Sequence, residues 1–389
     1  MQIVTVALLI IIGVLLFGFV IFFHELGHFA VARCLGMGVS TFSLGFGPKI
    51  LKRKLGKTEY ALSLVPLGGY VALVGESNES EIPEGFSPKE SFALRPAWQR
   101  LLVVIAGPAA NILLAWLLCW ILAFGWGTPV LLPDVGAVVE NSPAAKAGLK
   151  AGDRILSIDG QAVGSWDAMS AAIAHSDGKP MQLEVLRPAP EAAMETEPAA
   201  DGTRGQGATV EGTTLHLEMT AERAARKTIF GENETAWLIG VRAANSVDMQ
   251  PKGFWEAASA GATETGRMVS LTWLSFVKLA ERVVPLDQVG GPIMIAQMVG
   301  KQVHEGLPGL LALTALISIN LGILNLLPIP ILDGGQVVFC LLEIIFRRPV
   351  NRKVQEYAMR AGLALLIALM LLATFNDVWR LIKSAGGAG

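Results

Sequence analysis

Four long apolar runs divide the chain, and the stretches between them are mixed or polar. About 20 mostly apolar residues are enough for an α-helix to cross the hydrocarbon core of a bilayer. The third run is interrupted by Asn, Pro, Asp and Gly residues, a pattern typical of a discontinuous helix around a cavity. The sequence therefore predicts four transmembrane helices, at about residues 3–30, 98–126, 307–346 and 354–377.

The first apolar run could alternatively be a cleaved signal peptide. However, no basic segment precedes it, no small-residue cleavage site follows it, and it continues directly into His24 and Glu25. We therefore expect it to be retained as a span.

The regions between the spans predict smaller elements. Residues 127–225 alternate strand and helix patterns and predict an α+β domain, interrupted at 189–212 by a segment whose composition predicts a disordered insert without a catalytic role. Residues 253–284 have helical periodicity but too many charges for a span, so we expect this helix to lie on the membrane surface. The predicted divisions are 1–126 and 307–389 for the two halves of a membrane core, with a loop at 36–96, then 127–225 for the α+β domain and 226–306 for linker helices.

Composition and charge give the class of protein and its orientation. Hydrophobic residues make up 52% of the chain and charged residues only 16%, which indicates a membrane protein. The net charge of −2, without a basic face, argues against a nucleic-acid partner. Basic residues gather in the loops at 49–57 and 347–353, which the positive-inside rule places in the cytoplasm. This predicts a multi-pass membrane protein with both termini and residues 127–306 on the opposite side, which is the periplasmic side of the inner membrane if the cell is bacterial.

A metal-binding pattern follows the first apolar run. His24-Glu25-Leu26-Gly27-His28 is an HExxH motif. Residues four apart lie on one face of a helix, so the two imidazoles can bind one ion, and the glutamate between them can act as general base toward a water molecule. The alternative is three polar residues at the end of a helix, which is costly in so apolar a segment.

Catalytic zinc usually has three protein ligands, so a third donor is needed. Asp333 is the only acidic residue of the segment 325–335, where the third run is interrupted. It is therefore the candidate, with a helix-capping aspartate as the alternative. The histidines outside the motif, at positions 175, 216 and 304, are expected to be solvated.

The HELGH sequence at 24–28, together with NLLPIPILDGG at 325–335, closely resembles the site-2 protease family of intramembrane metalloproteases. Further shared motifs resemble the bacterial sigma-E regulator type: Gly45-Phe46-Gly47, Pro66-Leu67-Gly68-Gly69-Tyr70, Gly107-Pro108-x-x-Asn111 and Val289-Gly290-Gly291-Pro292. The resemblance implies that His24, His28 and Asp333 bind zinc, that Glu25 is the catalytic base and that Asn325 holds the substrate backbone. It also implies a re-entrant β-structure over 42–47 and 60–74, including Gly45, Gly68 and Gly69, along which an unwound substrate lies as an added strand.

The predicted α+β domain resembles a PDZ domain of the bacterial protease type. A PDZ groove binds an extended peptide between a strand and a helix. We expect those elements at Gly136, Ala137, Val138 and Val139 and at residues 166–174. The pattern has room for one such domain.

Together these patterns predict an intramembrane zinc metalloprotease that cuts single-pass membrane proteins, such as an anti-sigma factor or a remnant signal peptide. Two other functions remain open. One is a membrane-anchored HExxH protease acting on cytosolic substrates, which would need a glutamate ligand on a soluble helix. The other is a non-enzymatic membrane scaffold that collects partners through its PDZ domain.

Overall fold

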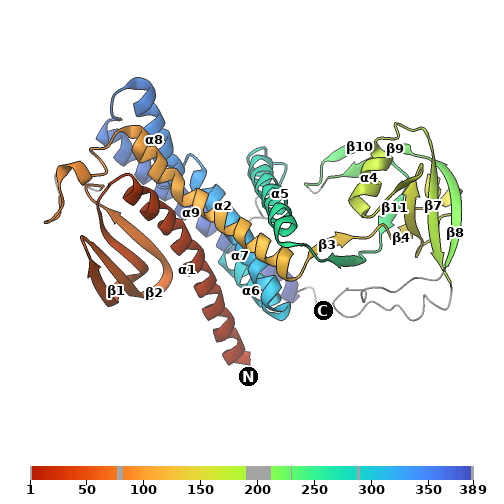
Figure 1. Ribbon diagram of the computed structural model, residues 1–389, viewed down its shortest axis with the longest axis horizontal. Helices are drawn as coiled ribbons and strands as arrows, with labels where there is room; N and C mark the ends of the chain where they lie inside the picture. The colour runs from red at the N-terminus through yellow and green to blue at the C-terminus, as the bar shows by residue number, and fades with distance from the viewer. Residues whose placement is uncertain are drawn as a thin grey trace. The chain divides into compact units, whose positions relative to one another are not determined.

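A computed structural model describes residues 2–76, 82–189, 212–228, 230–285, 287 and 290–386. The chain folds as two compact units, a helical unit formed by Met1–Leu122 with Ala257–Gly389 and a β-rich unit formed by Ala123–Glu256 (Figure 1). Its helices are α1 (Gln2–Cys34), α2 (Ala97–Gly125), α3 (Pro143–Lys146), α4 (Trp166–Ala174), α5 (Phe254–Ala280), α6 (Pro292–His304), α7 (Gly306–Leu326), α8 (Asp333–Phe346) and α9 (Arg352–Gly386).

Four helices in the described residues are long and apolar enough to cross a membrane, and they belong to α1, α2, α7 and α9. This confirms the predicted number of spans. Helix α1 continues to Cys34, beyond the predicted end of the first span at about residue 30. The HExxH motif therefore lies within a continuous helix and not at its end.

The predicted discontinuity in the third apolar run is confirmed. α7 ends at Leu326 and α8 begins at Asp333, and the two prolines at 328 and 330 lie in the break between them. The turn is tight, because a Cβ atom on Gly334 would lie 2.1 Å from the carbonyl oxygen of Leu327. The break places an acidic residue at the first position of a new helix.

The loop between α1 and α2 forms a β-hairpin of β1 (Val39–Leu55) and β2 (Thr58–Leu73). Thr41 of β1 pairs with Ala72 and also with Glu59, so the first part of β1 lies between the two ends of β2. The sheet packs on α1 through a cluster of aromatic rings: Phe22, Phe29, Phe42 and Tyr60. Strands were predicted here, and their re-entry into the membrane remains a prediction.

The core of the helical unit forms where α1, α2, α6 and α7 meet. α1 and α2 approach closely, since a Cβ atom on Gly27 would lie 2.3 Å from the carbonyl oxygen of Ala106. α5 also packs on this bundle: Gly261 lies against Trp120 of α2, and the Thr272 hydroxyl donates to Asn320 Oδ1 of α7 at 3.1 Å. The helix predicted to lie on the membrane surface therefore has at least one face on the bundle.

The β-rich unit is built around a four-stranded antiparallel sheet in the order β6-β5-β7-β8. α4 matches its predicted range, and a strand or short helix is found at each position that the sequence suggested. The insert predicted at 189–212 lies almost wholly outside the described residues. The strands of this unit are β3 (Thr128–Leu131), β4 (Val135–Val138), β5 (Arg154–Ile158), β6 (Gln161–Ala162), β7 (Pro180–Pro188), β8 (Gly212–Thr220), β9 (Glu222–Lys227), β10 (Asn233–Leu238), β11 (Val241–Ala243) and β12 (Val247–Gln250).

The β-rich unit extends further along the chain than the predicted domain, which ended at residue 225. β11 pairs with β4, and β12 pairs with β3 from the start of the unit. Residues 226–256 are therefore part of this unit and not a helical linker.

Candidate metal centre

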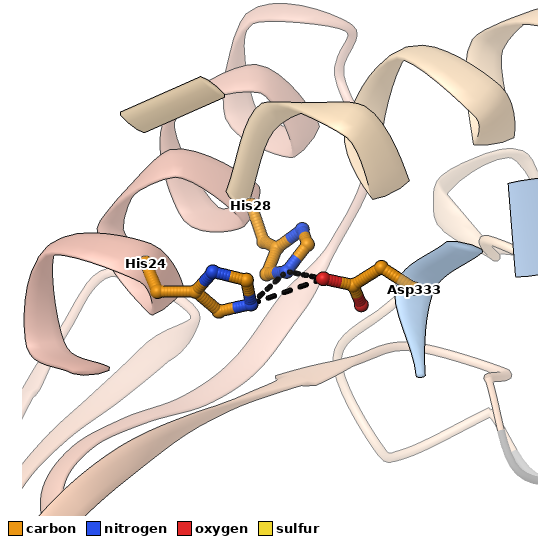
Figure 2. A group of neighbouring side chains, drawn as sticks. All are labelled: His24, His28 and Asp333. Carbon is orange, nitrogen blue, oxygen red and sulfur yellow. Dashed lines mark hydrogen bonds and ion pairs between the residues drawn. The ribbon is translucent and has the colours of Figure 1, made fainter. Parts of the chain in front are cut away.

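The two histidines of the HExxH motif lie one turn apart on α1 and are almost fully buried, with 5% of His24 and 9% of His28 exposed. Their Nε2 atoms are 3.2 Å apart. Figure 2 shows both rings turned toward the same point. The helical spacing therefore brings two metal-binding nitrogens together, as the motif predicts.

Asp333, the first residue of α8, completes the group. Its Oδ2 atom lies 3.0 Å from His24 Nε2 and 3.6 Å from His28 Nε2 (Figure 2). Oδ2 is buried and has no hydrogen-bond partner beyond these ion-pair contacts. Within the part of the chain that the structure describes, these three residues are the only group of His, Cys, Asp or Glu side chains arranged to share a metal ion.

The spacing of the three donor atoms fits zinc. Zinc binds imidazole nitrogen and carboxylate oxygen at about 2.0–2.2 Å in a tetrahedral arrangement, which requires neighbouring donors about 3.3–3.6 Å apart. The observed separations are 3.2, 3.0 and 3.6 Å. Two imidazoles and one carboxylate also match the three-ligand sets of catalytic zinc sites, which keep the fourth position for water or substrate.

Helix α2 supplies no metal ligand to this group, but it limits the space around the two imidazole rings. A Cβ atom on Gly107 would lie 2.3 Å from His28 Nε2 and 2.8 Å from His24 Cε1, so only glycine leaves room for both imidazoles. The Nδ1–H of His28 donates to the carbonyl oxygen of Val103 at 2.7 Å. Asn111, which is fully buried, lies 3.3 Å from His24 Nδ1 through its amide nitrogen.

The candidate base, Glu25, lies against strand β2. Its Oε2 atom accepts a hydrogen bond from the backbone N–H of Val71 at 3.1 Å. A Cβ atom on Gly69 would be only 3.8 Å from Glu25 Cγ. Val71 pairs with Phe42 of β1. The Glu25 carboxylate therefore lies beside the edge of β2 that faces away from β1.

The predicted substrate-contacting residues fall into two groups. Asn325, near the end of α7, brings its amide nitrogen within 3.3 Å of His24 Nε2, so it lies at the centre itself. The glycines at 45, 68 and 69 lie in the hairpin, where Gly45 and Gly68 have positive φ angles and a Cβ atom on Gly69 would lie 2.6 Å from the Ser43 carbonyl oxygen. The positive φ angles and the close backbone approach are sufficient to explain why these residues are glycines. Their contact with substrate remains a prediction.

The predicted peptide groove at Gly136–Val139 includes most of β4, which has a strand partner on one side and backbone contacts at Val135 on the other. β11 pairs with it on one side, and Val135 exchanges backbone hydrogen bonds with Gly152 and Asp153. Among the described residues, β11 has no strand partner other than β4. Val241 of β11 and Ile239 belong to the same apolar cluster as Met169 and Ile173 of α4. The groove at Gly136–Val139 remains a prediction, and β11 with α4 offers a second candidate groove.

Sequence reasoning assigned no role to Gly107 or Asn111, although it noted both within one motif. The available signal was their position, since a glycine and a buried amide stand four residues apart in an otherwise apolar helix. Val103 could not have been found, because any residue supplies the same backbone carbonyl.

Known proteins resemble this chain over nearly its whole length. The sequence profile described as "Peptidase family M50" matches residues 12–369. A Campylobacter jejuni protein with the provisional name of zinc metalloprotease is 35% identical over 371 residues, covering 95% of this chain and 93% of that protein. A similarly named protein of Clostridium acetobutylicum is 32% identical and covers 95% of this chain and 97% of its own length. The regulator of sigma-W protease RasP of Bacillus subtilis is 29% identical, with 95% of this chain and 97% of that protein covered.

Proposed function

This chain belongs to peptidase family M50, and from that premise we propose that it cleaves single-pass membrane proteins in or beside their transmembrane segments. It is a zinc metalloprotease and a multi-spanning membrane protein. The proposal concerns which bonds it cuts and which residues do so. The observation that carries it is the group of His24, His28 and Asp333 donor atoms, buried between helices that are long enough to span a bilayer.

We assign the three zinc ligands to His24, His28 and Asp333. Zinc supplies Lewis-acid polarisation of a water molecule and of the scissile carbonyl. Each ligand comes from a helix that is fixed by its neighbours: α1 is packed on α2, and α8 is anchored to α2 by the ion pair of Arg100 with Glu343 at 2.5 Å. This rigidity keeps the donors at the spacing that a tetrahedral ion requires.

Glu25 is the proposed general base. Its carboxylate accepts a proton from the attacking water and passes it to the leaving amide nitrogen. The hydrogen bond from the Val71 N–H orients the carboxylate beside the zinc ligands. The Asn325 amide, 3.3 Å from His24 Nε2, is within reach of a substrate carbonyl at the same centre and is proposed to steady it.

A substrate must be unwound before its peptide bond can be reached, because helical carbonyls are hydrogen-bonded and shielded. The edge of β2 around Gly69–Leu73 runs past Glu25. An extended segment added there would form main-chain hydrogen bonds with this edge and lie beside the base. This supports strand addition as the mode of substrate binding.

The β-rich unit is proposed to be a single periplasmic PDZ domain that controls access of substrates. None of the residues assigned to catalysis belongs to this unit. By analogy with the relative named as a regulator of sigma-W, an anti-sigma factor that an earlier protease has shortened is one candidate substrate, and a remnant signal peptide is another. We favour exclusion of long ectodomains over recruitment of termini, because a substrate confined to the membrane needs no further tether.

The test is Glu25→Gln in the full-length protein, with Glu84→Gln in the exposed loop before α2 as matched control. Zinc content should be unchanged in both, since both histidines and Asp333 remain. Proteolysis of a single-pass substrate should be lost only in Glu25→Gln. General-base catalysis contributes about 10²–10⁴-fold, so residual cleavage above about a hundredth of wild type would contradict the assigned role.

A further inference from the structure

Both histidines of the metal centre turn Nε2 toward Asp333, and Nδ1 of each ring faces α2. For His28 the choice of nitrogen has a clear cause. Its Nδ1 lies 2.7 Å from the Val103 carbonyl oxygen, which can only accept a hydrogen bond. Nδ1 therefore carries the proton, and Nε2 presents its lone pair to the centre.

His24 has a different partner on α2. Its Nδ1 is 3.3 Å from Asn111 Nδ2, while Asn111 Oδ1 is buried without a hydrogen-bond partner. An amide nitrogen only donates. If His24 Nε2 is to bind a metal, Nδ1 must carry the proton, and two donors would then face each other.

Rotating the Asn111 amide by 180° removes this conflict. Amide oxygen and nitrogen are nearly the same size, so the two orientations are distinguished by their hydrogen bonds. In the rotated orientation Oδ1 accepts the Nδ1–H of His24, and the amide nitrogen takes the buried position that Oδ1 held. The ring is then held in the same tautomer as His28.

The backbone of Asn111 is fixed from the opposite side by α7. The Ser318 hydroxyl donates to the Asn111 carbonyl oxygen at 2.7 Å, and both residues are fully buried. A Cβ atom on Gly322 would lie 3.3 Å from Asn111 Cβ, so α7 leaves little room for movement. The distance between the Asn111 amide and His24 is therefore fixed, and only the orientation of the amide group can change.

We propose that Asn111 is a positioning residue whose Oδ1 accepts from His24 Nδ1–H and thereby commits His24 Nε2 to zinc. This inference rests on the proposed zinc centre. Partners that orient a metal-binding histidine in this way typically contribute about 10–100-fold in metal affinity. The same contribution is expected for Asn111.

The experiment compares Asn111→Asp with Asn111→Leu in the full-length protein purified in detergent. The measured quantity is the zinc dissociation constant, obtained by competition with a chromophoric chelator. Aspartate presents an acceptor oxygen whichever way it is turned, so zinc affinity should stay within a few-fold of wild type. Leucine has a similar size but no acceptor, and affinity should fall by about 10–100-fold.

A role in packing alone predicts the opposite order, because leucine suits an apolar helix interface and a buried carboxylate does not. Zinc binding by Asn111→Asp that is as weak as that of Asn111→Leu, or weaker, would overturn the proposal. Ser318→Ala provides a second check, since it loosens the same helix contact but leaves the amide in place. It should bind zinc much more tightly than Asn111→Leu, and equal losses in the two variants would also count against the proposal.

The zinc centre itself is tested separately by wild type and His24→Ala. If wild type binds no zinc, the proposed centre fails. If wild type binds zinc and His24→Ala does not, while both Asn111 variants match wild type, only the role of Asn111 fails.

Discussion

Gly107→Ala is the smallest change expected to destroy the metal centre. The added methyl group would lie 2.3 Å from His28 Nε2, 2.5 Å from His28 Cε1 and 2.8 Å from His24 Cε1. Ordinary contact begins at 3.4 Å, so the closest atom must move by 3.4 − 2.3 = 1.1 Å. Zinc–ligand distances tolerate about 0.2 Å. The rings therefore cannot accept the methyl group and keep the ion at the same time.

The fold should tolerate this change better than the centre does. Overpacking of this size costs about 1–3 kcal/mol, and alanine favours the helix by about 1 kcal/mol relative to glycine. We expect a helical protein with normal expression, a lowered zinc affinity and proteolysis reduced by at least about 100-fold, the loss in rate that a misplacement of about 1 Å can cause. Zinc content by elemental analysis and helix content by circular dichroism would measure both effects.

Gly125→Ala is the matched control, because Gly125 lies at the end of the same helix and an added Cβ meets nothing within 4 Å. It should retain zinc and activity. Wild-type zinc content in Gly107→Ala would refute the reasoning, since it would mean that the imidazoles do not occupy the positions described.

Three further predictions concern the ligand, the topology and the β-rich unit. Asp333→Ala should lower zinc content together with activity, because two histidines leave the ion one protein ligand short; full occupancy would require another third ligand. Single cysteines at Lys54 and Asp177 should be labelled from opposite sides of the membrane, Lys54 from the cytoplasm, and labelling from one side would overturn the predicted topology. Replacing residues 128–250 by a short linker is feasible because Thr128 pairs with Gln250. The deletion should preserve zinc binding and raise cleavage of a long-ectodomain substrate relative to a short one, and an unchanged ratio of the two rates would exclude a role as a filter.

The spans and the candidate ligands could be predicted because their signals are local. An uncharged apolar run is sufficient for a spanning helix, and two histidines four apart on such a helix must share a face. The prolines at 328 and 330 predicted the break that the structure places between α7 and α8. Asp333 followed because it is the one carboxylate in the interrupted segment 325–335 of an apolar run, where an unpartnered charge is costly.

The remaining features depend on contacts between distant residues. β9 is exposed along its whole length and has no apolar alternation, so nothing in residues 222–227 distinguishes it from a linker. β11 is only three residues long and gains its partner from β4, about a hundred residues earlier. The double pairing of Thr41 with Ala72 and Glu59 likewise depends on where β2 bends, and a strand pattern alone does not specify its partner.

The HExxH motif identifies two ligands, but helix α2 determines how they are used. Helix α2 contributes no metal ligand. It provides the space for both rings at Gly107, the hydrogen-bond acceptor for His28 at Val103 and the amide beside His24 at Asn111. These three positions are four residues apart in sequence, so they recur on one face of the helix and turn that face toward α1. Two histidines on a helix can bind a metal through either nitrogen and at several spacings. A second helix that fixes both choices explains why α1 and α2 pack so closely at Gly27 and Ala106, since a wider separation would release the rings from all three contacts.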